Sequence, residues 1–489
     1  MRSLTNSRIK AEFPVSVPLL AARPLTLAES PASIAAIVSE PEGVREFVAS
    51  PDSPIQDGLY LSVHTKFVFA FAIGIAWLAF SLWVAIPWMR DLAGLSDWAI
   101  AVFAVGGIAI VPGFMNAFLV TSLMMDRRPP RSQLIEYPAV TILIAAFNEA
   151  TSIAATIHSI ERLCYPGPFE VMVIDDGSTD ATADIVDAIS FPWLTLLRQP
   201  KNMGKSAALN RGLKEARFAL IVTLDADSYL YADALEHLVE RYVADPANTR
   251  AVAGAMMVHN SRKNWVTRMQ EWDYFHGIAA TKRVQSLYQG TLVAQGAFSI
   301  YDRQTLRDIG GWEDCVGEDI VLTWAILQAG WRVGHAEDAI CFTDVPEELG
   351  QLIRQRQRWA RGMMEAFRRH PRILLMPRLS TAFIWWNLFF PWLDLAFTLC
   401  FMPGIVLAFF GIYWIVGPMT LALLPLSLLM NGAMYRVSAR MFNAEGLHVR
   451  YNPWGFAMYA LGYSLFLQPA CVFGYLSELF GLRKTWGTK

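Results

Sequence analysis

Long runs without a charged residue lie on both sides of a soluble middle segment, and they constrain the fold more than any other feature. Residues 67–88 and 98–125 contain no charged side chain, and residues 381–435 contain only one. A helix needs about 20 apolar residues to cross a bilayer. The sequence therefore predicts two transmembrane helices at 66–126 and about three more at 381–478. A composition that is 54% hydrophobic and 17% charged agrees with a membrane protein.

The segments outside these runs indicate how the chain is oriented. Residues 1–65 are rich in Pro, Ser, Ala and Glu and lack the apolar core of a signal peptide, so we expect a poorly ordered cytoplasmic extension. Arg127, Arg128 and Arg131 follow the second run, which predicts that the middle segment is cytoplasmic. The five scattered cysteines suggest reduced thiols. A net charge of -2 gives no reason to expect nucleic-acid binding.

Residues 137–345 alternate between strand and helix patterns. Short apolar runs predict strands at 140–145, 170–174, 194–197 and 219–224, and helical periodicity predicts helices at 150–163, 179–189 and 205–216. This alternation is typical of an α/β fold with a mainly parallel sheet and helices on both faces. Ligands of such sheets bind at the carboxyl ends of the strands.

Acidic pairs follow two of these strands. Asp225 and Asp227 flank one alanine after an apolar strand, and Asp176 ends the sequence Asp175-Asp176 after another. Two carboxylates at a strand end can share Mg²⁺ or Mn²⁺ and the diphosphate that the ion neutralises. Taken alone, however, either pair is also typical of a solvated surface turn.

Two further positions lie at predicted helix starts. Lys205 follows a glycine at the start of a helix, which makes a plausible anion site. Glu318 and Asp319 begin another helix after a Gly-rich loop. A carboxylate there can act as a general base, or it can simply interact favourably with the helix dipole. Position alone does not separate these interpretations.

Residues 349–372 have the pattern of an amphipathic helix that lies on a membrane surface. Its apolar residues form one stripe, and basic residues surround that stripe. The stripe consists of Leu352, Ile353, Trp359, Met363 and Phe367, and the arginines are Arg354, Arg356, Arg358, Arg361, Arg368 and Arg369. The simplest interpretation of most of these arginines is that they extend toward the membrane interface.

Five motifs occur in one order: Phe147-Asn148-Glu149, Asp175-Asp176-Gly177-Ser178, Asp225-X-Asp227, Glu318-Asp319 and Gln355-X-X-Arg358-Trp359. Over residues 66–480 the chain resembles the processive, membrane-embedded family 2 glycosyltransferases, which include cellulose, chitin, hyaluronan and poly-N-acetylglucosamine synthases. The stretch QRQRWARGMMEAF most resembles the bacterial poly-β-1,6-N-acetylglucosamine synthases.

This resemblance implies a GT-A-type transferase domain and a role for each motif. Asp319 would be the catalytic base, with Glu318 beside it, and Trp359 would stack under the acceptor sugar. Asp176 would contact the uracil with Phe147 packing nearby, and Glu149 would help to bind the substrate. Lys205 would lie near the donor, and Asp225 and Asp227 would hold nucleotide and metal. Gln355 and Arg358 would bind the diphosphate. One departure is Gly317, where the family usually has Thr before Glu-Asp.

The resemblance implies an inverting enzyme of the bacterial inner membrane. It would add N-acetylglucosamine from UDP-N-acetylglucosamine to a β-linked chain and pass the polysaccharide through its own helices. Its partners would be the UDP-sugar donor, the nascent polysaccharide and the lipid bilayer, and a small regulatory membrane subunit is compatible with this reading. The alternatives are a UDP-glucose-dependent glucan synthase, a transferase that adds one sugar to a lipid carrier, and a non-catalytic receptor or assembly scaffold. No cyclic-dinucleotide domain is expected after the last apolar run.

Overall fold

The computed structural model describes residues 61–126, 134–417 and 452–482, with isolated positions between 420 and 443. These residues all belong to one compact unit. The expected extension at 1–60 and the arginines at 127–131 lie outside the described residues.

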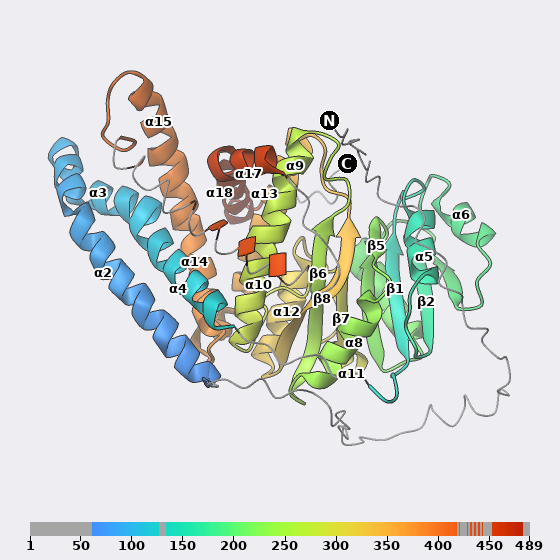
Figure 1. Ribbon diagram of the computed structural model, residues 1–489. Coiled ribbons are helices and arrows are strands. Elements are labelled where there is room, and N and C mark those ends of the chain that lie inside the picture. The colour runs from blue at the N-terminus through green and yellow to red at the C-terminus, as the bar shows by residue number, and fades with distance from the viewer. Residues whose placement is uncertain are drawn as a thin grey trace, which may run out of the picture. The chain divides into compact units, whose positions relative to one another are not determined.

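An eight-stranded mixed sheet forms the centre of the soluble domain (Figure 1). Its strands are β1 Val140–Ala146, β2 Phe169–Asp175, β3 Leu194–Arg198, β4 Leu220–Asp225, β5 Ser228–Leu230, β6 Thr249–Val258, β7 Phe298–Asp302 and β8 Arg332–Thr343. The strand order is β3-β2-β1-β4-β7-β6-β8-β5. β1, β2, β3 and β4 are parallel, so their carboxyl ends meet at one edge.

The four predicted strands are present, and the predicted α/β fold is confirmed. The second half of the sheet adds four strands that the apolar pattern did not mark. β7 is antiparallel to both β4 and β6, whereas β8 is parallel to β6 and antiparallel to β5. The sheet is therefore mixed.

Helices cover both faces of the sheet. The helices of the soluble domain are α5 Ile153–Glu161, α6 Thr182–Ala188, α7 Lys205–Glu215, α8 Ala234–Ala244, α9 Trp265–Trp272, α10 Ala279–Leu287, α11 Arg303–Asp308, α12 Glu318–Gln328 and α13 Leu349–Arg369, with the π-helix η2 Asp273–Ile278 and the 3-10 helix η3 Pro371–Leu375. Ile153, Ile157 and Leu238 of α5 and α8 are fully buried in the core on one face. Because both faces are covered, β1 and β4 are almost wholly buried and rich in Ile, Leu and Val.

The core on the other face continues into long apolar helices outside the domain. It combines Leu209 and Leu213 of α7 and Ile320 of α12 with Phe118 and Phe383, which lie in apolar helices that precede and follow the domain in the chain. The soluble domain and these helices therefore share one hydrophobic core.

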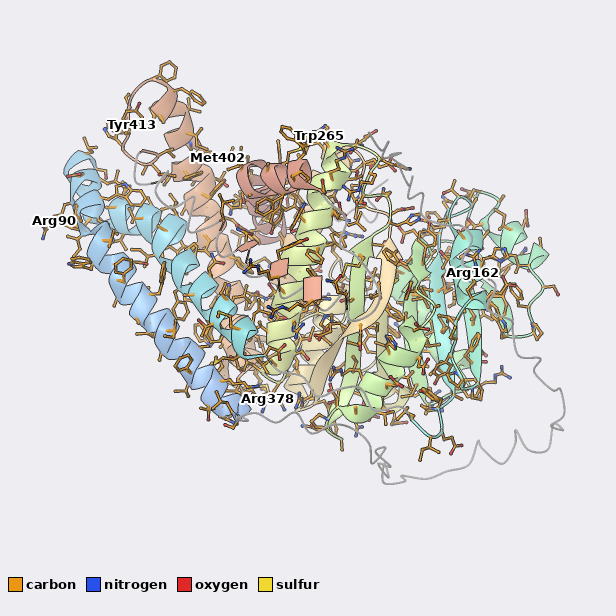
Figure 2. All side chains as sticks on the ribbon, in the orientation of Figure 1. Arg90, Arg162, Trp265, Arg378, Met402 and Tyr413 are labelled. Carbon is orange, nitrogen blue, oxygen red and sulfur yellow. The ribbon has the colours of Figure 1, made fainter. Side chains whose placement is uncertain are left out.

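Among the described residues, four helices are long and apolar enough to cross a membrane. They are α2 Val63–Leu95, the run Trp98–Met125 (α3 Trp98–Val105, η1 Gly106–Ile110 and α4 Val111–Met125), the run Thr381–Phe409 (α14 Thr381–Ala396, η4 Phe397–Phe401 and α15 Met402–Phe409), and the run Pro453–Leu479 (α17 Pro453–Met458, η5 Tyr459–Tyr463 and α18 Ser464–Leu479). The fifth predicted crossing falls within 418–451, where only isolated positions are described. Figure 2 shows Arg90 and Tyr413 at one end of these helices and Arg378 at the other.

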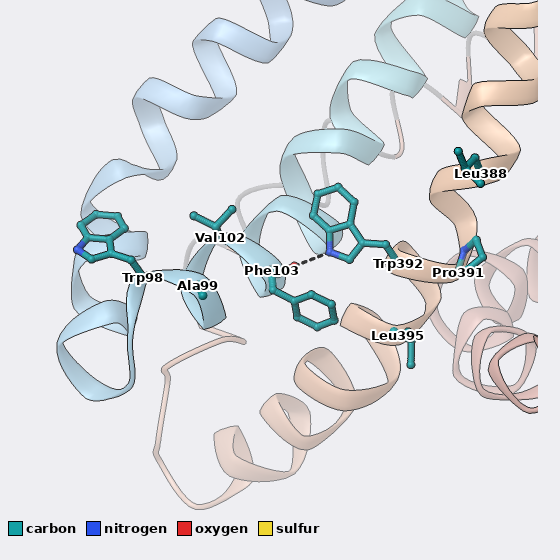
Figure 3. Close-up of a pocket in the computed structure, with 8 residues that line it drawn as sticks. All are labelled: Trp98, Ala99, Val102, Phe103, Leu388, Pro391, Trp392 and Leu395. Atoms are coloured by element: carbon teal, nitrogen blue, oxygen red, sulfur yellow. Dashed lines mark hydrogen bonds between the residues drawn. The ribbon is translucent and has the colours of Figure 1, made fainter. Parts of the chain in front are cut away.

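A shallow apolar groove lies between α3 and α14 (Figure 3). Trp98, Val102 and Leu388 are among its lining residues, and Trp392 Nε1 donates a hydrogen bond to the Phe103 carbonyl oxygen (3.1 Å). None of its eight lining residues carries a titratable side chain. The titratable side chains that the sequence motifs mark lie elsewhere, around the carboxyl edge of the sheet.

Candidate active site

The loops after β1 and β2 are joined to each other. Asn148 has a positive φ of 56°, and its backbone N–H donates to Ser178 Oγ (3.0 Å). The Glu149 N–H donates to Thr182 Oγ1 (2.8 Å), and the Glu149 carboxylate accepts a hydrogen bond from Ser152. Phe147 is left 41% exposed at the end of β1. The packing of this exposed ring against a nucleotide base stays a prediction.

Asp176 is buried and organises the loop before α7. Its Oδ1 accepts hydrogen bonds from Gln199 Nε2 (2.9 Å) and the Met203 N–H (2.8 Å), and its Oδ2 accepts one from the Gly204 N–H (2.8 Å). Burial raises the pKa of Asp176, while these two backbone donors favour its ionised form. In this structure Asp176 positions the start of α7, and its contact with uracil stays a prediction.

Lys205, the first residue of α7, joins two of the predicted acidic groups. Its ammonium lies 2.5 Å from Asp225 Oδ1 and 3.6 Å from Glu318 Oε1. Burial alone would lower the pKa of Lys205, but the charges of Asp225 and Glu318 outweigh it and raise that pKa. The structure therefore brings β4, α7 and α12 together around one cation.

Glu318 and Asp319 differ in their surroundings. Glu318 is buried, and this burial raises its pKa to about 7 although Lys205 opposes the shift. Asp319 is more exposed, and its Oδ1 accepts a hydrogen bond from the Ile320 N–H (2.7 Å). Asp319 Oδ2 makes no hydrogen bond to any part of the chain that the structure describes, so it can accept a proton from a ligand.

Tyr274 of η2 is buried within electrostatic range of Asp227, which follows β4, and of Arg358 on α13. Burial raises the pKa of Tyr274 to about 12, and both Asp227 and Arg358 act on it electrostatically. Arg358 also acts on Glu318. The predicted diphosphate-binding arginine therefore lies within electrostatic range of both acidic groups.

The arginines of α13 are not all at a surface, which corrects the simple interfacial interpretation. Arg356 is 4% exposed and Arg361 is 8% exposed. Arg361 pairs with Glu478 of α18, and its Nη2 donates to the Leu482 carbonyl oxygen (2.7 Å). α13 packs between α12 and α18, so these guanidinium groups meet buried carboxylates and not the membrane interface.

Arg356 belongs to a buried cluster that supports Trp359. Its Nη2 lies 2.9 Å from Asp273 Oδ2, which also accepts a hydrogen bond from the Tyr463 hydroxyl (2.9 Å). The guanidinium carbon of Arg356 lies 4.0 Å from the centroid of the Trp359 ring. Trp359 is 41% exposed, as a stacking platform requires. The amphipathic pattern did not indicate that Arg356 is buried, although this residue lies within the Gln355–Trp359 motif.

Gln355 is half-buried on the same helix. Its Oε1 is buried without a hydrogen bond to any described residue. Since a buried polar atom without a partner costs free energy, this oxygen is a candidate contact for a ligand.

The predicted metal site consists of the two carboxylates of Asp225 and Asp227. No group of three or more His, Cys, Asp or Glu side chains suited to a metal occurs within the described ranges. Mg²⁺ in nucleotide sites takes one or two carboxylates together with substrate phosphates and water. Two carboxylates separated by one residue at a strand end therefore fit such an ion when a diphosphate completes its coordination.

Residues 141–310 match the model "Glycosyl transferase family 2". The chain carries a family 2 glycosyltransferase domain. This domain includes the loops of Phe147, Asp176, Lys205 and Asp227, whereas α12 and α13 lie beyond the matched residues.

Two curated relatives bear the same name. The poly-beta-1,6-N-acetyl-D-glucosamine synthase of Staphylococcus aureus (strain COL) is 32% identical over 247 residues, which are 50% of this chain and 58% of the relative. The enzyme of that name from Staphylococcus epidermidis is 31% identical over 244 residues, 49% of this chain and 58% of the relative. The matched region thus spans less than two thirds of these relatives.

A solved structure shares the fold. A mannosyltransferase from Pyrobaculum calidifontis in complex with GDP-Man and Mn²⁺ covers 81% of this chain and 100% of its own, with a TM-score of 0.54 and 21% sequence identity. The transferase domain therefore has a GT-A-like fold.

Proposed function

We propose that this protein is an inverting, processive glycosyltransferase that polymerises N-acetylglucosamine from UDP-N-acetylglucosamine into a β-linked exopolysaccharide. One observation carries the proposal: Lys205 pairs with Asp225 and with Glu318, the neighbour of Asp319. Arg358 and the exposed Trp359 lie on α13, which packs against both α12 and the apolar helix α18. The names of the staphylococcal relatives support the choice of sugar.

The residues of the site fit the successive steps of a sugar transfer. Asp319 Oδ2 accepts the proton of the acceptor hydroxyl while the hydroxyl oxygen attacks the anomeric carbon of the donor. The bond from that carbon to the β-phosphate oxygen breaks, and UDP leaves with the electron pair. Attack opposite the leaving group inverts the anomeric configuration. Lys205 and Arg358 are placed to stabilise the charge on the departing diphosphate.

A divalent cation fits the same site. Asp227, with Asp225, would hold Mg²⁺ or Mn²⁺ against the diphosphate, and the bound ion would act as a Lewis acid on the leaving group. Phe147 would pack against the uracil, Trp359 would stack under the acceptor sugar, and Gln355 would contact the bound substrate. Glu149 and Asp176 would contribute mainly by shaping the loops that receive the nucleotide.

The membrane helices support a proposal about the product. α13 lies between the transferase domain and α18, so an acceptor chain that leaves Trp359 meets the membrane helices directly. We propose an inner-membrane protein whose transferase domain faces the cytoplasm and whose helices translocate the polymer.

Donor screening tests this function. The full chain, purified in detergent with Mg²⁺ or Mn²⁺, should release UDP from UDP-N-acetylglucosamine and form a polymer that linkage-specific glycosidases degrade. UDP-glucose should react much more slowly, because polar groups that bind the acetamido group would be left unpaired. Faster turnover of UDP-glucose would assign the protein to the glucan synthases, and no turnover of any UDP-sugar would favour a scaffold.

A further inference from the structure

A side chain of α13 holds the loop that leads into Glu318 and Asp319. Glu365 Oε2 accepts hydrogen bonds from the backbone N–H groups of Val316 (2.9 Å) and Gly317 (3.0 Å). Glu365 is only 2% exposed. Hydrogen bonds to an ionised acceptor are stronger than neutral ones, and removal of the acceptor would leave two buried donors without a partner.

The same loop touches α13 backbone to backbone. A Cβ atom built on Gly317 would lie 2.4 Å from Gly362 Cα, and one built on Gly362 would lie 2.7 Å from Gly317 Cα. Neither position can therefore accept a side chain without movement of the loop or the helix. This contact gives a physical reason for glycine at position 317, where the resemblance led us to expect threonine.

These contacts unite two parts of the site that are distant in the sequence. Gly317 directly precedes α12, which begins with Glu318 and Asp319. Glu365 and Gly362 lie on the helix that carries Arg358 and Trp359. A shift of α13 would therefore move the carboxylates along with the platform and the arginine.

We propose that Glu365 is a positioning residue that holds the Asp319 carboxylate at a fixed position relative to the Trp359 ring. This inference rests on the proposed function. Glu365 acts through the backbone of Val316 and Gly317, and the Gly317–Gly362 contact sets how closely loop and helix approach.

Two substitutions at one position test the role. In Glu365→Leu the loop loses its acceptor, so kcat for UDP release should fall by about 10- to 100-fold, the order expected for a misplaced reacting group. The KM for the donor and the affinity for UDP should stay unchanged, because Asp225, Asp227 and Lys205 are untouched. In Glu365→Gln the amide oxygen can still accept both hydrogen bonds, so most of the rate should return.

Glu170 offers a matched control. It is also buried (3% exposed), and its carboxylate accepts hydrogen bonds from Thr141 Oγ1 (2.6 Å) and the Arg217 N–H (2.9 Å). It lies at the amino end of β2, opposite the site. Glu170→Leu should lower thermal stability without a change in kcat at a temperature where the variant is folded.

A second readout does not depend on activity. Cys315 is buried (4% exposed) and directly precedes Val316 and Gly317. The rate at which a maleimide labels Cys315, measured by peptide mass spectrometry, therefore reports whether the loop opens. Labelling should be faster in Glu365→Leu and unchanged in Glu170→Leu.

The outcomes separate the two proposals. If Glu365→Leu retains wild-type kcat or wild-type protection of Cys315, the positioning role is overturned. If Cys315 becomes accessible in Glu365→Leu but the wild-type protein turns over no UDP-sugar, the role of Glu365 in holding the loop is supported and the proposed function fails.

Discussion

Glu318 and Asp319 are neighbours in the chain, but their environments suit them for different tasks. Glu318 is buried against Lys205, whereas Asp319 presents one carboxylate oxygen without a hydrogen bond within the described structure. A general base must reach the proton that it removes, and only Asp319 has an oxygen free for this. Glu318 instead contributes to the charge around Lys205.

Asp319→Asn should separate chemistry from binding. The substitution keeps the shape of the side chain and removes the proton acceptor, so sugar transfer should fall by about a hundred- to ten-thousandfold. UDP binding in Mg²⁺, measured by calorimetry, should persist in this variant. Asp227→Asn is the contrasting variant, in which metal-dependent UDP binding should weaken. A dead Glu318→Gln beside a fully active Asp319→Asn would mean that the base is the other carboxylate.

Glu318 should make stability depend on pH. Burial raises its pKa from 4.5 to about 7, so the unfolded chain loses this proton first as the pH rises. The free energy of unfolding should therefore decline between about pH 4.5 and pH 7 and level off above, by about 3 kcal/mol at most. Denaturant midpoints at pH 5 and pH 8, without nucleotide or metal, measure this. Wild type and Glu318→Gln should differ in their pH dependence, and equal curves would contradict the assignment.

At the scale of elements, α13 is the helix on which the site depends most. It carries Arg358 and Trp359, and its Glu365 holds the loop that precedes Asp319. It also joins α18 through the ion pair of Arg361 with Glu478. A helix with so many buried charged contacts cannot slide along a membrane surface without breaking them.

Trp359→Ala should stop polymer formation while UDP binding persists, because the variant loses the aromatic surface on which a sugar stacks. Product length, measured by electrophoresis of labelled polymer, is the readout. Trp265→Ala is the matched control, since Trp265 is similarly exposed (44%) and also lies beside a membrane helix, near Phe466. Met363 on the same helix is unsuitable because it is 8% exposed within the core. Similar loss in both tryptophan variants would indicate that Trp359 serves only in packing.

The elements that could be predicted are those whose pattern is local. β1 and β4 are short apolar runs ending at turns or acids, so their positions follow from sequence. β6 contains three alanines and one glycine, which are depleted in strands, so its sequence does not mark a strand in the same way. The motif residues of the site were predictable for the same local reason. The contact of Glu365 with Val316 joins residues 49 positions apart, and no local pattern marks it.

At the scale of the whole molecule, the transferase domain and the membrane helices are joined by buried charges as well as by a common core. Asp126 directly follows α4, and its Oδ2 lies 2.5 Å from Arg283 Nε of α10. Arg283 Nη1 also lies 3.4 Å from Glu337 Oε1 of β8. One arginine therefore ties the end of a membrane helix to both a helix and a strand of the soluble domain.

Arg283→Met should weaken this junction strongly. The substitution keeps much of the side-chain volume but removes the guanidinium group that Asp126 and Glu337 share. Removal of one partner from a buried ion pair typically costs about 3–5 kcal/mol. The midpoint of thermal unfolding in detergent, followed by tryptophan fluorescence, should therefore fall by several degrees. Lys263→Ala is the control, because Lys263 pairs with Glu347 (2.7 Å) at an exposed site and such pairs contribute under about 1 kcal/mol. Adding Asp126→Asn and Glu337→Gln to Arg283→Met should restore part of the stability, since the two carboxylate charges that faced Arg283 are then removed as well. Equal midpoints for Arg283→Met and Lys263→Ala would show that the apolar core alone holds the two parts together.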